Sequence, residues 1–388
     1  MNRLLSLAAL LAVLLAVLPG CRADDAGPPS PPAAAPSARD MQVEVVARGL
    51  DHPWAVAPLP DGGFLVTERK GNLRRISAEG AVSAPLEGVP EVWAHGQGGL
   101  LDVATAPDFA GTRRIYFTYA EPGPDGTAGT AAAYATLGDS AISDVHVIYR
   151  QQPKLHGPNH FGSRLAFDGE RHVFISQGER FHKSLAQDLT RLQGKLVRLD
   201  MEGGVPADNP FVDHPEARPE IWSYGHRNMQ GMAVDPLTGT LWASEHGPRG
   251  GDELNQPRPG ANYGWPIVSH GMDYGTGRPY PETIGTAAPG MAAAVHVWNK
   301  SPGLSGMAFY REHPESPWND SLFLGALADR NLIRLSLDGD TIVAEERLLQ
   351  DRGARIRDVR AAADGNIYVV TDAADGELLR LVPPKTGR

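Results

Sequence analysis

The stretch from His156 to Arg164, with the sequence HGPNHFGSR, contains the residue of this chain that is best suited to exchange a proton. His160 stands directly before the apolar residues 165–167, which predict a strand, so a rigid backbone would hold its imidazole. Histidine is the side chain whose ordinary pKa lies nearest neutrality, which suits a general base. We therefore interpret His160 as a candidate catalytic base; the alternative is a loop histidine whose hydrogen bonds are satisfied.

Three arginines could bind an anion. Arg355 and Arg357 are two residues apart, so on a strand their side chains point to the same face, and Arg227 would add a third guanidinium group. Arginine grips planar anions through paired hydrogen bonds. A cofactor with several carboxylates would need such groups, whereas an uncharged sugar would not; the alternative is a set of surface arginines.

The elements that must position these residues recur along the chain as short runs of aliphatic and aromatic residues. Successive runs start 51, 58, 68, 81 and 45 residues apart, which is about the length of a four-stranded blade with variable loops. The runs are FLVT from Phe64, IYFT from Ile115, VFIS from Val173, LWAS from Leu241, LFLG from Leu322 and IYVV from Ile367. With 44 Gly and 33 Pro as turn residues, they predict an all-β chain, a six-bladed β-propeller with four-stranded blades. The alternative is a β-sandwich.

Each run is preceded by another apolar strand, and polar residues stand four to six positions before the centre of each of these strands. The first strand of a propeller blade lines the central channel, so these residues would converge at one end of it, where a ligand site is expected. They are His52, Gln97, His160, Arg227 with Asn228, Ser301 and Arg355.

Composition excludes several functions. The formal net charge of −10 argues against a nucleic-acid partner. The chain has no Gly-x-Gly-x-x-Gly between a strand and a helix, and its single cysteine excludes Cys-x-x-Cys-His and iron–sulfur sets. Any electron carrier must therefore be held without cysteine.

A glycine- and oxygen-rich stretch, EHGPRGGDE from Glu245 to Glu253, is followed by NYGW at Asn262–Trp265. Such loops suit a hard cation such as Ca²⁺, which accepts backbone carbonyls and carboxylates together. The alternative is an ordinary turn-rich loop.

The N-terminus has the pattern of an export signal, with Arg3 followed by an apolar run from Leu4 to Leu18. The closing tetrapeptide Leu-Pro-Gly-Cys21 resembles a bacterial lipobox, which implies lipidation of Cys21 and a periplasmic protein anchored to the outer membrane; the alternative is a simple signal peptide. The expected parts are a signal peptide (1–20), a Pro/Ala-rich tether (21–40) and the folded domain (41–384).

Seven motifs, in order along residues 41–384, resemble those of the soluble pyrroloquinoline quinone (PQQ) dependent sugar dehydrogenases, in particular the aldose sugar dehydrogenase branch of the glucose/sorbosone dehydrogenase family. They are GQGGLLDV from Gly96, NHFGSRL from Asn159, GKLVRL from Gly194, IWSYGHRN from Ile221, EHGPRGGDE from Glu245, NYGW from Asn262 and RIRDV from Arg355.

The resemblance implies that His160 takes the proton of the anomeric hydroxyl while a hydride passes from that carbon to PQQ, giving a lactone. Glu179 falls where relatives orient the histidine with a carboxylate. Electrons would then pass to an external acceptor.

The resemblance also implies ligands for PQQ and calcium. The expected cofactor contacts are Gln97, Arg227, Asn228, Arg355 and Arg357. The expected calcium ligands are the carbonyls of Gly247 and Pro248 at one ion, and Glu253 with the carbonyl of Tyr263 at a second, structural ion.

One departure concerns a lysine that relatives place on the cofactor, at the position of Ala328. Arg330 or Lys300 would have to compensate; otherwise the affinity for PQQ is expected to be weaker. Two other function classes stay open, a calcium-dependent propeller lactonase or hydrolase and a non-catalytic binding propeller. The sequence leaves open which aldose is oxidised, the electron acceptor and the oligomeric state.

Overall fold

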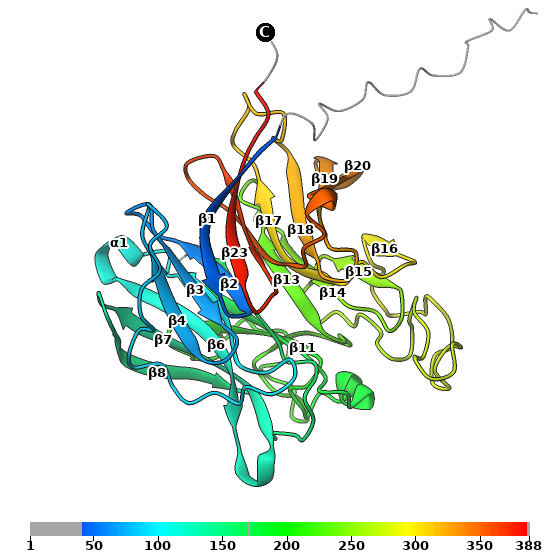
Figure 1. Cartoon of the computed structure of the whole chain (residues 1–388). Coiled ribbons are helices and arrows are strands. Elements are labelled where there is room, and N and C mark those ends of the chain that lie inside the picture. The colour runs from blue at the N-terminus through cyan, green and yellow to red at the C-terminus, as the bar shows by residue number, and fades with distance from the viewer. Residues whose placement is uncertain (1–40, 170, 386–388) are drawn as a thin grey trace, which may run out of the picture. The chain divides into compact units, whose positions relative to one another are not determined.

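The computed structural model describes residues 41–169 and 171–385, which fold into six antiparallel β-sheets (Figure 1). The innermost strands are β2 (Pro53–Pro58), β5 (Leu100–Thr105), β9 (Gly162–Asp168), β13 (Met229–Val234), β17 (Leu304–Tyr310) and β21 (Ile356–Ala361). The second strands are β3 (Phe64–Glu68), β6 (Arg114–Pro122), β10 (His172–Gln177), β14 (Leu241–Glu245), β18 (Ser321–Ala326) and β22 (Ile367–Thr371).

The outer strands complete the sheets. The third strands are β4 (Asn72–Ile76), β7 (Ala128–Leu137), β11 (Lys195–Asp200), β15 (Asp252–Asn255), β19 (Asn331–Asp338) and β23 (Gly376–Val382). The fourth strands are β8 (Ile142–Arg150), β12 (Ile221–Tyr224), β16 (His296–Trp298), β20 (Thr341–Leu348) and β1 (Gln42–Leu50). The short helices are α1 (Phe109–Thr112) and three 3₁₀ turns, Pro124–Gly126, Lys183–Gln187 and Gln350–Arg352.

The six innermost strands contact one another in the cyclic order β2, β5, β9, β13, β17, β21 and back to β2. This ring confirms the predicted all-β, six-bladed propeller. Within the described residues, five blades have four strands and the blade β2-β3-β4 has three, with Val82 adding a single backbone bridge to Ile76 at its outer edge.

The ring is closed by pairing the two ends of the described chain. β1 lies antiparallel to β23, with Gln42 opposite Val382 and Leu50 opposite Gly376, so blue and red strands lie side by side in Figure 1. A propeller closed in this way leaves only short sheet edges exposed.

The second strands are largely buried because each blade is covered by a neighbour on both faces. All five residues of β22 and all five of β3 are buried, whereas most residues of the outer strand β20 are exposed or half-buried. A strand that is buried on both faces reads as a continuous apolar run, and this is why these segments were visible in the sequence.

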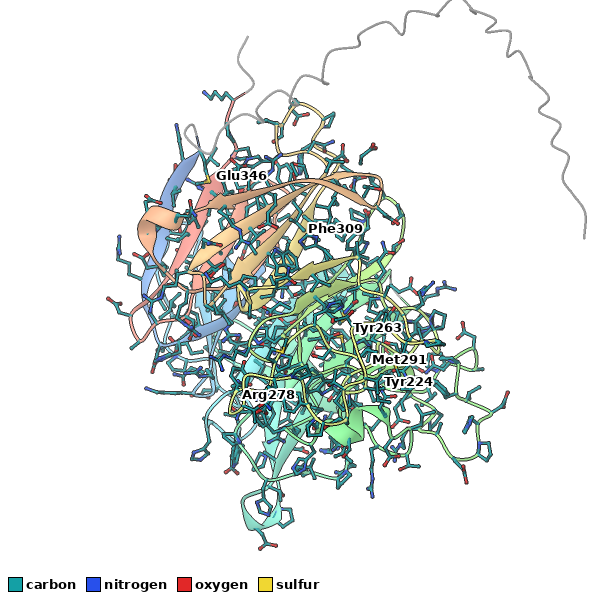
Figure 2. All side chains as sticks on the ribbon, turned by 90° about the vertical axis from the view of Figure 1, so that its right-hand side faces the viewer. Tyr224, Tyr263, Arg278, Met291, Phe309 and Glu346 are labelled. Carbon is teal, nitrogen blue, oxygen red and sulfur yellow. The ribbon has the colours of Figure 1, made fainter. Side chains whose placement is uncertain are left out.

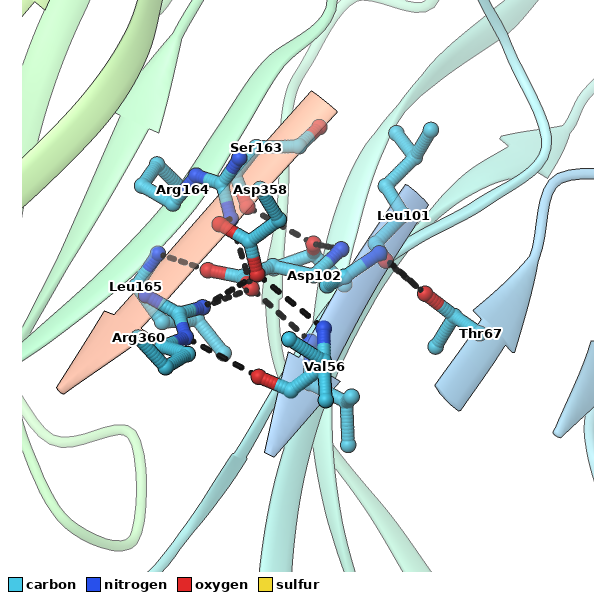
Figure 3. Close-up of polar contacts among 12 residues, drawn as sticks. Val56, Thr67, Leu101, Asp102, Ser163, Arg164, Leu165, Asp358 and Arg360 are labelled. Carbon is cyan, nitrogen blue, oxygen red and sulfur yellow. Dashed lines mark hydrogen bonds and ion pairs between the residues drawn. The ribbon is translucent and has the colours of Figure 1, made fainter. Parts of the chain in front are cut away.

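A buried ion network crosses the central channel (Figure 3). Arg164 donates to Asp102 (3.1 Å) and Asp358 (2.8 Å), and Arg360 donates to Asp102 (2.7 Å). The carboxylates also accept backbone N–H groups, Asp358 from Val56 (3.0 Å) and Asp102 from Leu165 (2.8 Å). Because these residues come from four different blades, the network joins the inner strands around the channel.

The predicted signal peptide, Cys21 and tether lie in residues 1–40, outside the described residues. Within 41–169 and 171–385, no helix has the length and apolar character needed to span a bilayer.

Candidate active site

A cavity of about 300 Å³ opens at the end of the channel where the innermost strands begin. Its lining includes four of the polar residues expected to converge there, namely Gln97, Asn228, Ser301 and Arg355. His52 is not among the lining residues, and its imidazole contacts Asp51 (2.7 Å) beside it.

His160 is not itself among the lining residues of this cavity, but it directly precedes two that are, Phe161 and Gly162. Its backbone N–H donates to Oε1 of Gln97 (2.8 Å), and its Nδ1 contacts Oε2 of Glu179. Because a carboxylate only accepts, Nδ1 carries the proton of this bond, which leaves the lone pair on Nε2. Among the described residues, none makes a hydrogen bond to Nε2, so this nitrogen is free to accept a proton from a bound molecule.

The backbone geometry that brings Glu179 to His160 depends on Gly178. A Cβ at position 178 would overlap the carbonyl oxygen of His160, so only glycine permits this approach of the two segments. His160 itself has a φ of 55°, in the left-handed region that an L-residue seldom adopts. Strained backbone of this kind gathers at functional sites.

Burial lowers the pKa of His160 below its ordinary value, while the Glu179 carboxylate opposes this shift and the Arg227 and Arg180 guanidinium groups reinforce it. The imidazole is therefore neutral, and able to act as a base, at neutral pH.

The cavity wall carries three arginines and one carboxylate. Arg355 donates to Asp372 through Nη2 (3.0 Å) and to the carbonyl of Leu327 (3.1 Å). Arg357 lies 3.6 Å from the same carboxylate, and burial lowers its pKa to about 10. Arg69 also lines the cavity, and no ion pair joins it to another described residue. This wall therefore has an excess of positive charge that an anionic ligand would neutralise.

Arg227 and Asn228 point into different spaces. Asn228 lines the main cavity and accepts the N–H of Gly162 (3.1 Å) through its side-chain oxygen. Arg227 lines a smaller adjoining cavity of about 20 Å³ and donates to the carbonyls of His246 (3.1 Å) and Gly247 (3.3 Å). His246 lines both cavities and so forms the wall between them.

All four predicted calcium ligands line the smaller cavity: Gly247, Pro248, Glu253 and Tyr263. Burial, with the nearby Glu245 carboxylate as the next cause, raises the pKa of Glu253 to about 8. Within the described residues no group of three His, Cys, Asp or Glu side chains is arranged around a metal position, so any ion here would need backbone carbonyls as ligands. That donor set, carbonyls with one carboxylate, is one that Ca²⁺ accepts.

The loop around Asn262 forms part of this smaller cavity. Asn262 makes backbone bridges to Tyr224 on one side and Met291 on the other, and Figure 2 shows Tyr224, Tyr263 and Met291 gathered in this region. The ring of Tyr263 stacks on His226 at 4.8 Å. These contacts fix the segment that carries the Tyr263 carbonyl.

Ser223, His226 and Glu245 form a hydrogen-bonded chain that the sequence reasoning did not single out. Nε2 of His226 contacts Ser223 Oγ at 2.8 Å, and Nδ1 contacts Glu245 at 3.0 Å. These are the partners of a hydrolase triad. However, Ser223 and His226 are fully buried and neither lines either of these two cavities, so a substrate has no access to the hydroxyl.

The residues offered as substitutes for the family lysine, Lys300 and Arg330, are not among the residues that line the cavity. Lys300 is 87% exposed and its ammonium pairs with Asp329 (2.9 Å), while Arg330 is exposed. Ala328 does line the cavity, and so does Arg69.

Trp54 is a further lining residue that sequence reasoning missed. Two guanidinium groups lie over its ring, Arg164 at 4.3 Å and Arg357 at 5.7 Å from the ring centre. Arg69, Trp54 and His246 escaped notice because a single arginine, tryptophan or histidine beside a strand has no distinctive pattern.

Comparison with known proteins adds four relationships. The family described as Glucose / Sorbosone dehydrogenase matches residues 50–380 of the chain. Aldose sugar dehydrogenase YliI of Escherichia coli (strain K12) is 53% identical over 346 residues, which cover 88% of this chain and 93% of that protein. The crystal structure of the soluble aldose sugar dehydrogenase from Escherichia coli in the apo-form is 52% identical, with a TM-score of 0.85, and the match covers 88% of this chain and 99% of that one. The PQQ-bound form of aldose sugar dehydrogenase from Streptomyces coelicolor is 28% identical with a TM-score of 0.73, covering 88% and 98%.

Proposed function

The chain belongs to the glucose/sorbosone dehydrogenase family, and on that premise we propose that it oxidises aldoses at the anomeric carbon to lactones. PQQ and Ca²⁺ are the proposed cofactors, and His160 is the proposed general base. The single observation that carries the proposal is the contact of His160 with Glu179, directly before the residues that line a cavity whose wall is rich in arginine.

In this mechanism His160 accepts the proton of the anomeric hydroxyl on Nε2. Glu179 holds the ring through Nδ1 and stabilises the imidazolium that forms, as carboxylates do in other acid–base pairs. When bound, PQQ supplies the acceptor for the hydride that leaves the anomeric carbon. The relationship to a protein whose PQQ-bound form is known supports this choice of cofactor.

The cavity residues suit a flat polyanion. Arg69, Arg355 and Arg357 offer guanidinium groups to carboxylates, and Gln97 and Asn228 offer amide groups for the remaining polar atoms. Arg227, which lines the adjoining cavity, adds a further positive charge. Three arginines against the single carboxylate of Asp372 would be costly for a site meant for a neutral sugar alone.

We propose Ca²⁺ sites at the smaller cavity, one at the carbonyls of Gly247 and Pro248 and one at Glu253 with the Tyr263 carbonyl. A cation at the first would polarise a neighbouring electron acceptor, and one at the second would compensate the buried Glu253.

The calcium-dependent lactonase or hydrolase alternative is disfavoured because, among the described residues, no three His, Cys, Asp or Glu side chains are arranged around a metal position. The buried Ser223–His226–Glu245 chain is also closed to substrate. The non-catalytic alternative is disfavoured because binding alone does not require a histidine whose Nε2 is free to accept a proton. We further propose an external electron acceptor and, from the lipobox-like sequence at Cys21, a periplasmic location with a lipid anchor.

The test is reconstitution of the purified protein, from residue 22 onward, with PQQ and Ca²⁺, followed by reduction of an artificial dye with glucose and other aldoses. We expect dye reduction that needs PQQ, Ca²⁺ and sugar together. Tight PQQ binding without reduction by any aldose would contradict the proposed substrate class. Absence of PQQ binding would contradict the cofactor.

A further inference from the structure

The turn from Glu179 to His182, which follows β10, has an unusual conformation. The N–H of His182 donates to the carbonyl of Glu179 (2.9 Å), and both central residues, Arg180 (φ 57°) and Phe181 (φ 64°), lie in the left-handed region. Turns of this kind normally use glycine or asparagine at both positions. An arginine followed by a phenylalanine is strained there, and such strain persists only where the surroundings enforce it.

The Arg180 side chain is one part of those surroundings. Its buried guanidinium donates to the carbonyl of Asn159 (2.9 Å), contacts the carbonyls of Ala128 and Gly157, and lies 3.8 Å from the centre of the Phe161 ring. These contacts hold the segment on both sides of His160. The position of Arg180 in the turn is therefore explained by its contacts with the protein.

The position of Phe181 has no such explanation. Its side chain is 58% exposed, although phenylalanine gains stability mainly through burial. Its backbone N–H donates to Oε2 of Glu179 (3.2 Å), the oxygen that also contacts His160. Its ring centre lies 4.5 Å from that of His160, with the rings tilted by 44°. The turn thus holds an exposed aromatic ring against the imidazole that carries the free Nε2.

We propose that the Phe181 ring forms a wall of the sugar subsite, on which the C–H face of an aldopyranose packs while its anomeric hydroxyl meets Nε2 of His160. This inference rests on the proposed function and adds a residue that determines specificity. An aromatic face is electron-rich and attracts the slightly positive hydrogens of C–H groups. The ring offers no hydrogen-bonding group, so a hydroxyl pointing at it would lose its water without a new partner. The subsite therefore favours aldoses whose stacked face is free of axial hydroxyls.

The experiment compares Phe181→Ala and Phe181→Trp with Leu237→Ala, a control in which an equally exposed side chain (56%) is removed from a turn between β13 and β14. In the protein loaded with PQQ and Ca²⁺, Phe181→Ala is expected to raise the KM for a preferred aldose about tenfold. Phe181→Trp should restore the KM of the parent protein. The PQQ affinity of the Phe181 variants and the kinetics of Leu237→Ala should equal those of the parent protein. The discrimination against epimers with an axial hydroxyl should shrink in Phe181→Ala.

Direct binding provides a readout that does not need turnover. An anhydro sugar, the glucose analogue that lacks the anomeric hydroxyl, is titrated into the parent protein and Phe181→Ala while its contacts are followed by saturation-transfer NMR. Weaker binding to Phe181→Ala supports the sugar wall even if the parent protein turns over no aldose, an outcome that would overturn only the proposed dehydrogenase activity. Equal binding, or an unchanged KM in an active Phe181→Ala variant, would overturn the inference about Phe181.

Discussion

Nδ1 of His160 and the carboxylate of Glu179 meet at one end of a β-hairpin, although 19 residues separate them. His160 stands just before β9 and Glu179 just after β10, and the two strands pair with Gly162 opposite Gln177. The antiparallel register therefore returns the chain to the level of His160 at the position where the carboxylate is needed. The register of the β9–β10 hairpin therefore positions Glu179 against His160.

Glu179→Gln is expected to move the acid limb of the kcat/KM profile to lower pH. The carboxylate favours the protonated imidazole, so its removal lowers the pKa of His160 further. The imidazolium also loses its partner during proton transfer, so kcat should fall on the order of a hundredfold. Steady-state kinetics as a function of pH check both effects. Asp168→Asn, which breaks the remote Asp168–His172 pair (3.1 Å), is the matched control, and a limb that moves to higher pH would contradict the assignment.

His160→Ala is expected to retain PQQ binding while kcat falls by about a hundredfold or more, the usual scale for loss of a general base. Titration with PQQ separates the two effects, and His172→Ala serves as a control at a half-buried histidine outside the cavity lining. If turnover in His160→Ala equals that of the parent protein, another group is the base.

The double variant Arg355→Ala, Arg357→Ala is expected to weaken PQQ binding by at least about a hundredfold, because two charge-assisted contacts are lost. Arg69→Ala alone should weaken it less but measurably, since Arg69 lines the same wall. Equilibrium titration of PQQ checks this, with Arg48→Ala as a control for loss of an exposed arginine. Unaltered affinity in the double variant would mean that the anion binds elsewhere.

Calcium is expected to raise the melting temperature of the parent protein, because a ligand that binds only the folded state stabilises it by about 2.7 kcal/mol at a hundred times its Kd. Glu253→Gln removes the carboxylate of the smaller cavity and should reduce this increase. Thermal unfolding with Ca²⁺ and with a chelator measures the difference. The exposed Glu216→Gln should keep the full effect, and an equal increase in Glu253→Gln would exclude this carboxylate as a ligand.

Asp358→Ala is expected to lower the free energy of unfolding by about 3–5 kcal/mol, the scale for breaking a buried ion pair by removing one of its members. Arg164, which is fully buried, loses a 2.8 Å contact, and the N–H of Val56 loses its acceptor. Denaturant unfolding checks the value against Asp213→Ala at an exposed position. A change within about 0.5 kcal/mol, typical of surface substitutions, would show that the network does not hold the channel together.

The parts of the fold that could be predicted from the sequence are the ones buried on both faces. The runs beginning at Phe64, Ile115, Val173, Leu241, Leu322 and Ile367 all lie in the second strands of their blades. Outer strands such as β20 mix exposed and half-buried residues, so they have no continuous apolar run, and the sequence gives little indication of where they lie.

The site could be predicted in part for a similar reason. Polar residues at strand starts share a geometry, which is why Gln97, Asn228 and Arg355 were found, but a turn before the strand can redirect one of them, as His52 with its φ of 48° illustrates. Contacts between distant segments have no local pattern at all. Arg164 and Asp358 are 194 residues apart, and no periodicity in the sequence pairs them.

The pairing of β1 with β23 also fixes where the described chain begins relative to the cavity. Gln42 of β1 pairs with Val382 of β23, and the neighbouring Leu381 lies opposite Ile367 of β22. Ile367 in turn lies opposite Ala361, at the end of β21 that is far from Arg355. The described chain thus begins at the end of the propeller remote from the cavity. The first described strand therefore starts at one end of the propeller, and the mouth of the cavity lies at the opposite end.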